Sequence, residues 1–469
     1  MRLAKVDKPF IRRWIFAIAI LFTTSASYSQ LPEAQQIASK MNVGWNLGNT
    51  LEAICGENAW GNPNTTQRFI DSVKAAGFNT IRIPVAWFCH SDTSESVIDE
   101  DWLERVKEVV DYCINDSMYV VMNAHWDKGW LENRVNLDNQ DQVNERQFAY
   151  WTQIATFFKD YDEHLLFAGA NEPNVENATG MQVLQTYHQT FIDAVRQTGG
   201  NNASRTLIIQ GPSTDIEKTN KLMTSLPTDI IENRLMLEVH YYTPYQFCLM
   251  EKDADWGKVF YYWGKDYHSK TDVAHNATWG EERDVEKLFA MMKTQFVDKG
   301  IPVILGEFLA IKRSNLSGDN MALHVASRQY FHQYVVGSAI KHGIIPYYWD
   351  TGDYGSGLFN RHNGSKIDKD NLDAIMQGAK NQVSTVIHYK NIEASYFPNP
   401  FTSTVTLNID TPEKIDSIVI SDSSGKLTEK IIGNQIKKSI IFGGSFTPGI
   451  YLVQIFAENT EKSFKIIKQ

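Results

Sequence analysis

Short apolar runs alternate with amphipathic segments from Asn42 to about Gln382. The runs are a few residues long and are bounded by polar residues, which is typical of buried strands. The segments between them place apolar residues three or four positions apart, which is typical of helices that bury one face. We predict strands at residues 43–46, 80–84, 119–123, 165–170, 207–210, 235–240, 302–306 and 344–349, and helices at 66–76, 102–115, 144–159, 184–198, 285–299 and 322–342.

The order of these elements predicts how the strands pair. Strands that are each followed by a helix form parallel sheets, because the helix carries the chain back to the start of the next strand. Eight such units are the number in a closed (β/α)8 TIM barrel, and a doubly wound open sheet is the alternative. The first predicted strand is not followed by the Gly-rich phosphate turn that would favour the open sheet. We therefore predict an α/β TIM barrel for residues 30–385.

The pattern changes after about Val386. Residues 396–401, Tyr-Phe-Pro-Asn-Pro-Phe, are rich in turn-forming residues, and residues 404–409 then alternate apolar and polar side chains as a strand does. A further strand pattern at 448–453 follows a Pro-Gly turn. We predict that residues 394–469 form a small all-β sandwich.

The amino terminus has the pattern of an export signal. Basic residues precede an apolar run at 14–22, and small residues follow it. The run is shorter than the about 20 residues that a membrane-spanning helix needs. We predict a signal peptide at residues 1–29 with cleavage near Ser29, against the alternative of an uncleaved anchor. No later stretch is long and apolar enough to span a bilayer, so we expect no stable membrane insertion.

The composition excludes some classes of function. Hydrophobic residues make up 43% and charged residues 21% of the 469 residues, which is ordinary for a folded protein and argues against disorder. The net charge of −10 argues against a nucleic-acid partner, because phosphate binding needs clustered Lys and Arg. The 12 Trp and 20 Tyr residues fit either a large core or a sugar-binding cleft, since one face of a pyranose ring is apolar.

The four cysteines leave their pairing open. Cys55, Cys89, Cys113 and Cys248 could form disulfides in an exported protein, in three connectivities. Their spacing fits no metal-binding motif. A large barrel does not need disulfides for stability, so free buried thiols are an equal alternative.

Polar residues end several of the predicted strands. In a TIM barrel the reactive side chains stand at the carboxyl-terminal ends of the strands, so these positions are the candidates for a site. A barrel built for stability alone has no reason to gather such residues at one rim. The residues are Arg82, His125, Asn171, Glu172, His240, Tyr242, Glu307 and Trp349.

Two of these residues are carboxylic acids. Glycoside hydrolysis needs one carboxyl group that protonates the leaving oxygen and a second that attacks the anomeric carbon or activates a water. Glu172 and Glu307 end the fourth and seventh predicted strands, where they can face each other across the barrel mouth. A positive charge such as Arg82 lowers the pKa of a neighbouring carboxyl group, and Trp349 offers a flat face for a sugar ring. The structural alternative is that Glu307 takes part in a buried ion pair.

These residues lie in segments that together resemble glycoside hydrolase family 5. The resemblance covers roughly residues 31–382 and follows the order of the family. Its segments are Gly-Trp-Asn-Leu-Gly-Asn-Thr-Leu-Glu at 44–52, Gly-Phe-Asn-Thr-Ile-Arg-Ile-Pro at 77–84, Val-Val-Met-Asn-Ala-His at 120–125, Phe-Ala-Gly-Ala-Asn-Glu-Pro at 167–173, Val-His-Tyr-Tyr-Thr-Pro at 239–244, Pro-Val-Ile-Leu-Gly-Glu-Phe at 302–308 and Tyr-Trp at 348–349.

The resemblance implies a role for each matching position. Glu172 corresponds to the acid/base and Glu307 to the nucleophile of a retaining reaction. Asn171 is similar to the residue that binds the 2-hydroxyl beside the cleaved bond. Many members have two adjacent histidines after the third strand, whereas here Trp126 takes the second position, which bears on substrate contacts rather than on the reaction. The other matching positions of the active centre are Arg82, His125, His240, Tyr242 and Trp349.

The carboxyl-terminal unit resembles the sorting domain of the type nine secretion system. The matching pieces are Phe-Pro-Asn-Pro-Phe at 397–401, Asp-Ser-Ser-Gly at 422–425 and Pro-Gly-Ile-Tyr at 448–451. The resemblance implies the secretion machinery as a partner, and a protein that passes through the periplasm and ends outside the cell or on its surface. A carbohydrate-binding module is the alternative.

We therefore expect a secreted retaining endo-β-1,4-glucanase that acts on cellulose or related β-glucans. Xyloglucanase, mixed-linkage β-glucanase and mannanase activities of the same family are alternatives, and a polysaccharide-binding protein without catalysis is an alternative of another class. The reaction needs only carboxyl groups, so we expect no cofactor and no metal. We expect a monomer.

Overall fold

The structure, a computed structural model, describes residues 30–353, 355–383, 393–410, 415–422, 426–432, 436–457 and 460–469. The predicted signal peptide at 1–29 lies outside the described residues. The chain divides near Met376 into two compact units. This division falls inside helix α10 (Lys369–Val383), so the domain boundaries set from the sequence remain predictions.

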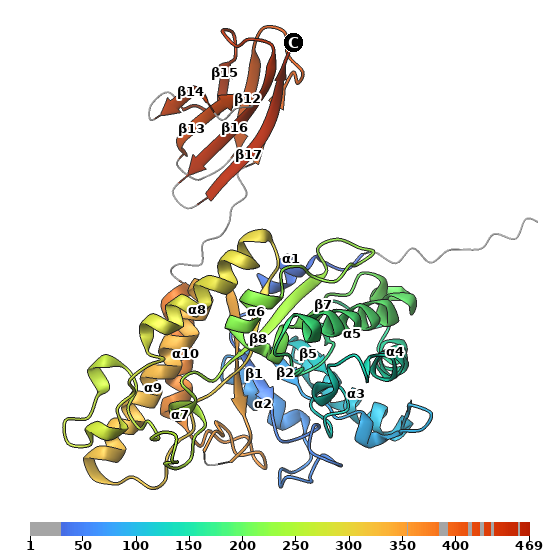
Figure 1. The fold of residues 1–469 in the computed structure, drawn as a ribbon, viewed down its shortest axis with the longest axis vertical. Helices are drawn as coiled ribbons and strands as arrows, with labels where there is room; N and C mark the ends of the chain where they lie inside the picture. The colour runs from blue at the N-terminus through green and yellow to red at the C-terminus, as the bar shows by residue number, and fades with distance from the viewer. Residues whose placement is uncertain are drawn as a thin grey trace, which may run out of the picture. The chain divides into compact units, whose positions relative to one another are not determined.

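Eight parallel strands close into a barrel in the first unit (Figure 1). The first strand pairs with the second on one side and with the last on the other, which closes the sheet. The predicted TIM barrel is therefore confirmed, and each predicted strand corresponds to one in the structure. The strands are β1 (Gly44–Leu47), β2 (Thr80–Ile83), β5 (Tyr119–Asn123), β6 (Leu165–Ala168), β7 (Leu207–Gln210), β8 (Leu235–Tyr241), β9 (Val303–Phe308) and β10 (Ile344–Asp350).

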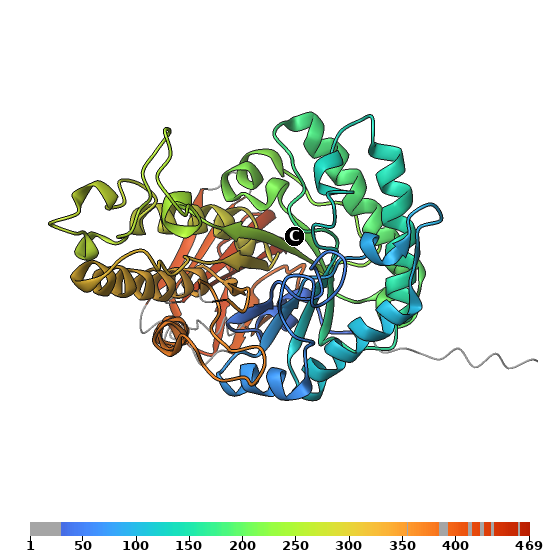
Figure 2. The same ribbon diagram turned by 90° about the horizontal axis from the view of Figure 1, so that it is seen from below.

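Helices surround these strands (Figure 2). Several begin at residues whose side chains accept a backbone N–H of the first turn, as Thr66, Asn177 and Asp215 do. The six predicted helices are α2 (Gln67–Ala75), α3 (Glu100–Asn115), α4 (Gln140–Phe157), α5 (Ala178–Gln197), α8 (Glu282–Gln295) and α9 (Gly318–Lys341). The helices α1 (Ala34–Ala38), α6 (Ile216–Leu222), α7 (Tyr245–Cys248) and α10 were not predicted.

An apolar layer fills the amino-terminal half of the barrel. Side chains from the first residues of the strands, such as Val121, Ile208 and Ile304, pack there against Ile37 of α1. Burying each aliphatic side chain of this kind contributes about 1.5–3 kcal/mol. Helix α1 thus covers the end at which the strands begin, and polar side chains are left to gather at the end where the strands finish.

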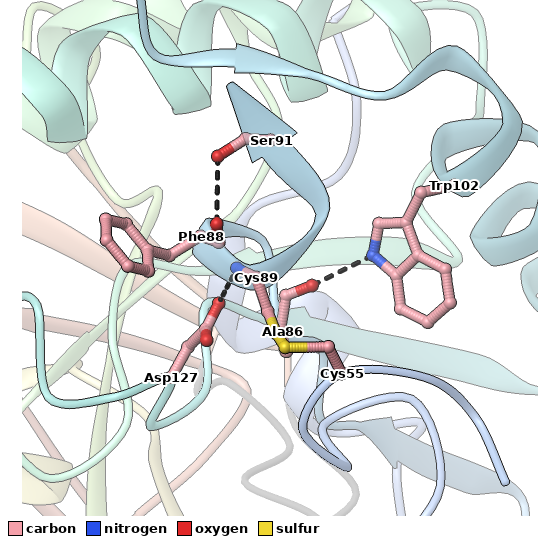
Figure 3. The surroundings of a disulfide bond; sticks show 7 residues. All are labelled: Cys55, Ala86, Phe88, Cys89, Ser91, Trp102 and Asp127. Atoms are coloured by element: carbon pink, nitrogen blue, oxygen red, sulfur yellow. Dashed lines mark hydrogen bonds between the residues drawn. A yellow bond between two sulfur atoms is a disulfide. The ribbon is translucent and has the colours of Figure 1, made fainter. Parts of the chain in front are cut away.

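One disulfide joins two loops at the carboxyl-terminal ends of the strands (Figure 3). Cys55 follows β1 and is bonded to Cys89, which follows β2, whereas Cys113 and Cys248 are free and buried. The backbone N–H of Cys89 also donates to Asp127 Oδ2 at 2.8 Å, so the loop after β5 is held to the same place. Each alternative for the cysteines therefore holds for two of them: Cys55 and Cys89 form a disulfide, and Cys113 and Cys248 are free buried thiols.

The second unit consists of β-strands in two sheets. One sheet has the order β11 (Glu393–Phe397), β12 (Val405–Asp410), β15 (Ser439–Phe442), and the other has the order β14 (Leu427–Ile432), β13 (Ile415–Asp422), β16 (Gly449–Ala457), β17 (Thr460–Lys468). Apolar residues of both sheets, such as Leu407, Ile420 and Val453, share one buried cluster. The predicted all-β architecture of this unit is confirmed. Within the described part of the chain, no helix combines the length and the apolar character that crossing a bilayer requires.

Candidate active site

The eight site residues predicted from the sequence all lie at the carboxyl-terminal ends of barrel strands or in the few residues that follow. Their side chains form one connected group, joined by hydrogen bonds, ring contacts and charge interactions. Arg82 lies in β2, His125 after β5, Asn171 and Glu172 after β6, His240 in β8, Tyr242 directly after β8, Glu307 in β9 and Trp349 in β10.

Arg82 of β2 contacts residues of β1, β8 and β9 and of the loop after β6, at the centre of this group. Its side chain is fully buried, and Nη1 donates to Glu307 Oε1 at 2.9 Å and to Asn46 Oδ1 at 3.0 Å. Nη2 donates to Asn171 Oδ1 at 2.7 Å, and Nε lies 2.8 Å from Glu238 Oε1. A buried charge is tolerated only when opposite charges and hydrogen bonds replace its lost hydration. The charges of Glu238 and Glu307 outweigh burial and raise the pKa of Arg82.

Both carboxylate oxygens of Glu307 accept hydrogen bonds. Arg82 is bound to Oε1, and the Tyr242 hydroxyl donates to Oε2 at 2.8 Å. Burial and then the charge of Glu307 raise the pKa of Tyr242 well above its ordinary value, which keeps this hydroxyl protonated and able to donate. Glu307 is only 5% exposed. One side of the carboxylate is therefore held by the protein and its position is fixed.

Glu172 is the more accessible of the two acids, with 44% of its side chain exposed. Its Oε1 lies 2.6 Å from His240 Nδ1, and the Thr214 hydroxyl donates to the same oxygen at 3.4 Å. Burial by itself raises the pKa of Glu172. The hydrogen bond and the charge of His240, helped by Arg82, outweigh burial and leave the pKa below its ordinary value.

His240 stands between the two acids and a third one. Nδ1 lies 2.6 Å from Glu172 and 3.7 Å from Glu307 Oε2, and Nε2 lies 3.2 Å from Glu238 Oε1. Burial lowers the pKa of His240. The charge of Glu307 and the hydrogen bonds to Glu172 and Glu238 have the larger, opposite effect, and the pKa is raised to about 9. The imidazole is therefore positively charged at neutral pH.

His125 and Trp349 lie together on another part of the rim. Their rings are stacked, with centroids 5.6 Å apart and planes 8° from parallel. Burial and the charges of Arg82 and His240 hold the pKa of His125 well below its ordinary value, so this histidine is neutral. Trp126, at the position where many family members have a second histidine, is 40% exposed.

Sequence reasoning missed Glu238, which is fully buried in β8. Residues two apart on a strand point to the same side, so Glu238 shares the barrel interior with His240. A carboxylate inside an apolar strand, two residues before a candidate histidine, was the signal that could have identified it. Gln210 was also missed; its Nε2 donates to Glu238 at 2.7 Å, and its Oε1 accepts the backbone N–H of Ala170 at 2.9 Å.

A cavity of about 460 Å³ opens beside Glu172. Its wall includes Thr214, which is hydrogen-bonded to Glu172, and also Tyr242, Trp279 and Lys287. Trp279 is 47% exposed and presents an aromatic surface to this space. The residues that line the cavity include Glu172 but not Glu307, so the cavity extends from one side of the reaction centre.

The described residues contain two groups whose spacing would suit a metal ion. In each, carboxylate and imidazole atoms of three residues lie within 4.8 Å of one another. One group, Asp162 to His164, is exposed or half-buried. In the other, which consists of Glu172, His240 and Glu307, a hydrogen bond already joins His240 Nδ1 to Glu172. We assign metal ligands in neither group.

The second unit matches a known protein family. Residues 395–469 match the secretion system C-terminal sorting domain. This match confirms the resemblance seen in the sequence. A sorting domain of this kind directs a protein to the outside of the cell or to its surface, so the chain is an exported protein.

Several relatives are endoglucanases. A xyloglucan-specific endo-β-1,4-glucanase of Bacteroides ovatus is 37% identical over 367 residues, which cover 74% of this chain and 70% of that protein. Endoglucanase A of Paenibacillus barcinonensis is 34% identical over 416 residues, which cover 80% of this chain and 100% of that protein. A solved structure of a xyloglucan-specific β-1,4-glucanase from a ruminal metagenomic library, in complex with XXLG, is 43% identical with a TM-score of 0.68, and the match covers 74% of this chain and 96% of that one.

The family itself is identified by the barrel unit. Residues 38–355 match cellulase (glycosyl hydrolase family 5), which is the family that the strand-end residues resemble. The match spans all eight barrel strands and all eight predicted site residues. The chain is therefore a glycoside hydrolase that belongs to glycosyl hydrolase family 5.

Proposed function

We propose that this enzyme is an endo-β-1,4-glucanase that retains the configuration of the anomeric carbon and acts by double displacement at Glu172 and Glu307. The observation that carries the proposal is the closeness of the two acids: one carboxylate oxygen of each lies within 4.8 Å of the other. Retaining enzymes place their carboxyl groups about 5–5.5 Å apart, whereas inverting enzymes need about 6.5–9.5 Å to admit a water molecule between acid and sugar.

The surroundings of Glu307 suit a nucleophile. A nucleophilic carboxylate must be ionised and must point one oxygen at the anomeric carbon. Arg82 and Tyr242 each donate a hydrogen bond to Glu307. These bonds orient the carboxylate and leave it ionised. Its low exposure keeps water from competing for the oxygens.

The surroundings of Glu172 suit the acid/base. This residue has to reach both the leaving oxygen and, later, an incoming water, and its side chain is the more exposed of the two and borders the cavity. We place the leaving part of the substrate in that cavity, where Trp279 can stack on a sugar ring. The nearest hydrogen-bond partner of Glu172 in the free protein is His240, whose Nδ1 lies 2.6 Å from Oε1.

The remaining residues are placed to hold the sugar on the other side of the cleaved bond. We assign the 2-hydroxyl to Asn171, whose Oδ1 is fixed by Arg82. Trp349 is stacked on His125, and we assign the apolar face of the sugar beside the cleaved bond to this tryptophan. Neutral His125 can hydrogen-bond a hydroxyl group without attracting an anion.

Xyloglucan is a second candidate substrate, and two observations favour it. Two of the relatives described above are named as xyloglucan-specific. The cavity beside Glu172, at about 460 Å³, falls within the range of about 300–1,000 Å³ in which proteins bind small molecules, so it can take a sugar branch as well as the main chain.

A panel of polysaccharides separates these candidates. Initial rates on carboxymethylcellulose, barley β-glucan, xyloglucan and glucomannan, compared at equal mass, rank the backbones and their branches. An endo-β-1,4-glucanase shortens soluble glucans quickly while releasing few reducing ends. Preference for xyloglucan by more than about tenfold in kcat/KM, or about 1.4 kcal/mol, would identify the branch as part of recognition. Glucomannan as the only substrate would overturn the proposal.

A further inference from the structure

Glu238 is too deeply buried to contact the substrate, but it contacts Arg82 and His240 of the active site. Its carboxylate is fully buried, with Oε1 2.8 Å from Arg82 Nε and 3.2 Å from His240 Nε2. Oε2 accepts a hydrogen bond from Gln210 at 2.7 Å. A Cβ atom on Gly306 would lie 2.0 Å from Oε1, so the glycine beside Glu307 is what leaves room for this carboxylate.

The position of Glu238 fixes the protonation of His240. Nδ1 faces Glu172 and Nε2 faces Glu238, so each ring nitrogen meets a carboxylate oxygen. An ionised carboxylate only accepts hydrogen bonds, and a neutral imidazole has only one N–H to give. A neutral His240 would therefore turn a lone pair toward one of the two carboxylates, whereas an imidazolium satisfies both.

We propose that Glu238 is a positioning residue that keeps His240 doubly protonated, so that His240 stores the proton which Glu172 delivers to the leaving oxygen. The proposal rests on the acid/base role given to Glu172 under the proposed function. It explains how Glu172 can be ionised in the free enzyme and still act as an acid, because the proton it needs lies one hydrogen bond away.

The proton balance closes over one turnover. In the first half, the proton on His240 Nδ1 moves to Glu172 and then to the glycosidic oxygen, as the C–O bond breaks and Glu307 bonds to the anomeric carbon. His240 is left neutral, with its remaining N–H on Glu238. In the second half, water gives a proton to Glu172, which returns it to Nδ1, while the water oxygen bonds to the anomeric carbon and the bond to Glu307 breaks.

The charges around His240 favour this storage. Carboxylates face the ring from three directions: Glu172 from the loop after β6, Glu307 from β9 and Glu238 from β8 itself. The opposing cation is Arg82 of β2, which shares Glu238 with the histidine. The other titratable neighbours are His125 after β5 and Tyr242 after β8, and both are neutral. Consistent with this balance, the pKa of His240 is raised to about 9 even though burial lowers it.

Glu238→Gln tests the proposal, since it keeps the shape of the side chain and removes its charge. Without the charge of Glu238, His240 loses its proton at lower pH. We therefore expect the alkaline limb of the pH profile of kcat/KM on β-glucan to move to lower pH by one unit or more. At pH 10, above the limb of both enzymes, the variant should lose roughly tenfold or more on the polysaccharide, because at such a pH a shift of one unit is about a tenfold change in the protonated fraction. Aryl cellobiosides with a dinitrophenol leaving group should lose less than about threefold, since they need little protonation.

A second measurement does not depend on the variant folding. Nitrogen-15 NMR of the wild-type enzyme, with His240 assigned by comparison with His240→Asn, should show both ring nitrogens protonated at pH 7. In Glu238→Gln one of them should lose its proton at a pH at least one unit lower than in the wild type. A wild-type His240 that is already neutral at pH 7 would overturn the proposal, whatever happens to the variant.

Glu52→Gln is the matched control. Glu52 is another buried carboxyl group of the barrel rim, but it accepts hydrogen bonds from backbone N–H groups of its own loop rather than from His240 or Arg82. The Glu52→Gln variant should keep the alkaline limb of the pH profile at its wild-type pH. Equal losses by Glu238→Gln on both kinds of substrate would show that the residue acts through Arg82 and Glu307 instead, and the proposal would be wrong. The proposed function fails separately, on the anomer of the first product, which Glu238→Gln does not alter.

Discussion

Arg82 Nη1 lies 2.9 Å from Glu307 Oε1, although 225 residues separate them in the sequence. The guanidinium belongs to the second barrel strand and the carboxylate to the seventh, so this contact spans the barrel mouth. The same guanidinium reaches Asn171, beside Glu172. One buried cation thus fixes the candidate nucleophile directly and fixes the residue next to the candidate acid/base.

Replacing Arg82 with methionine should therefore impair both stability and activity. The change leaves Glu238 and Glu307 as buried carboxylates without their shared cation, which typically costs about 3–5 kcal/mol. We expect this loss in the free energy of unfolding, measured by urea denaturation, and a fall in kcat of at least about a hundredfold under conditions where the variant remains folded. A variant with near-normal kcat would show that Arg82 is only a structural partner.

The two acids should respond differently to removal. Glu307→Ala should abolish turnover of every substrate, because no group remains to attack the anomeric carbon. Glu172→Ala should reduce the rate on β-glucan by about 10²–10⁴-fold but much less on aryl glycosides with acidic phenols, since those leaving groups need little proton transfer. Steady-state rates on both kinds of substrate measure this. Near-normal hydrolysis of β-glucan by either variant would rule out the assigned role.

The charge on His240 makes a pH-dependent contribution to stability. Its folded-state pKa of about 9 lies above the ordinary value of 6.5, so the contribution is complete below about pH 6.5 and is lost as the pH rises through 9. We expect the difference in unfolding free energy between wild type and His240→Asn to shrink by on the order of 3 kcal/mol between pH 6 and pH 10. A difference that stays constant over this range would contradict the charged state of His240.

The disulfide between Cys55 and Cys89 should stabilise the loops that it joins (Figure 3). Closing a loop of this length, with a sequence separation of 34, restricts the unfolded chain by about 4 kcal/mol in the chain-entropy account. Reductant should lower the unfolding midpoint of the wild type and should leave the Cys55→Ser/Cys89→Ser variant unchanged. Cys113→Ala is the control that keeps the disulfide and its response to reductant.

The sorting domain should be separable from catalysis. Truncation before residue 394 should leave kcat and KM on soluble β-glucan nearly unchanged, and should stop export in a host with the secretion system. Fusion of residues 394–469 to an unrelated periplasmic protein should export that protein. Loss of binding to insoluble cellulose, with export intact, would point instead to a carbohydrate-binding module.

The sequence was most informative where the chain alternates simply. Each barrel strand is an apolar run, and a polar residue at or near its end, such as Glu307 one residue before the end of β9, marks the site. Helix α6 was missed because its seven residues are too few to show a helical period, whereas α10 carries Leu372 and Ile375 at helical spacing and could have been found. The sequence could not show which cysteines meet, because that depends on how loops after different strands lie in space.

Glu238 illustrates the same limit inside the site. It lies within an apolar run, where a single charged residue carries no sign of its partners. Only the closed barrel brings Arg82 from β2 to one side of it and Gln210 from β7 to another. The residues that would touch substrate were therefore predictable from strand ends, and Glu238 was recognisable at most as a buried carboxylate near a candidate histidine, whereas its partners were not predictable.

The stereochemistry of the first product distinguishes a retaining reaction at Glu307 from an inverting one. Proton NMR can follow the anomeric signals of cello-oligosaccharides from the earliest turnover, before mutarotation mixes them. The closest oxygens of the two carboxyl groups lie within 4.8 Å, which suits the about 5–5.5 Å separation of retaining enzymes better than the about 6.5–9.5 Å of inverting ones, so we predict that the β-anomer appears first and the α-anomer grows in only later. If the α-anomer appears first, the enzyme inverts, and Glu307 is not its nucleophile.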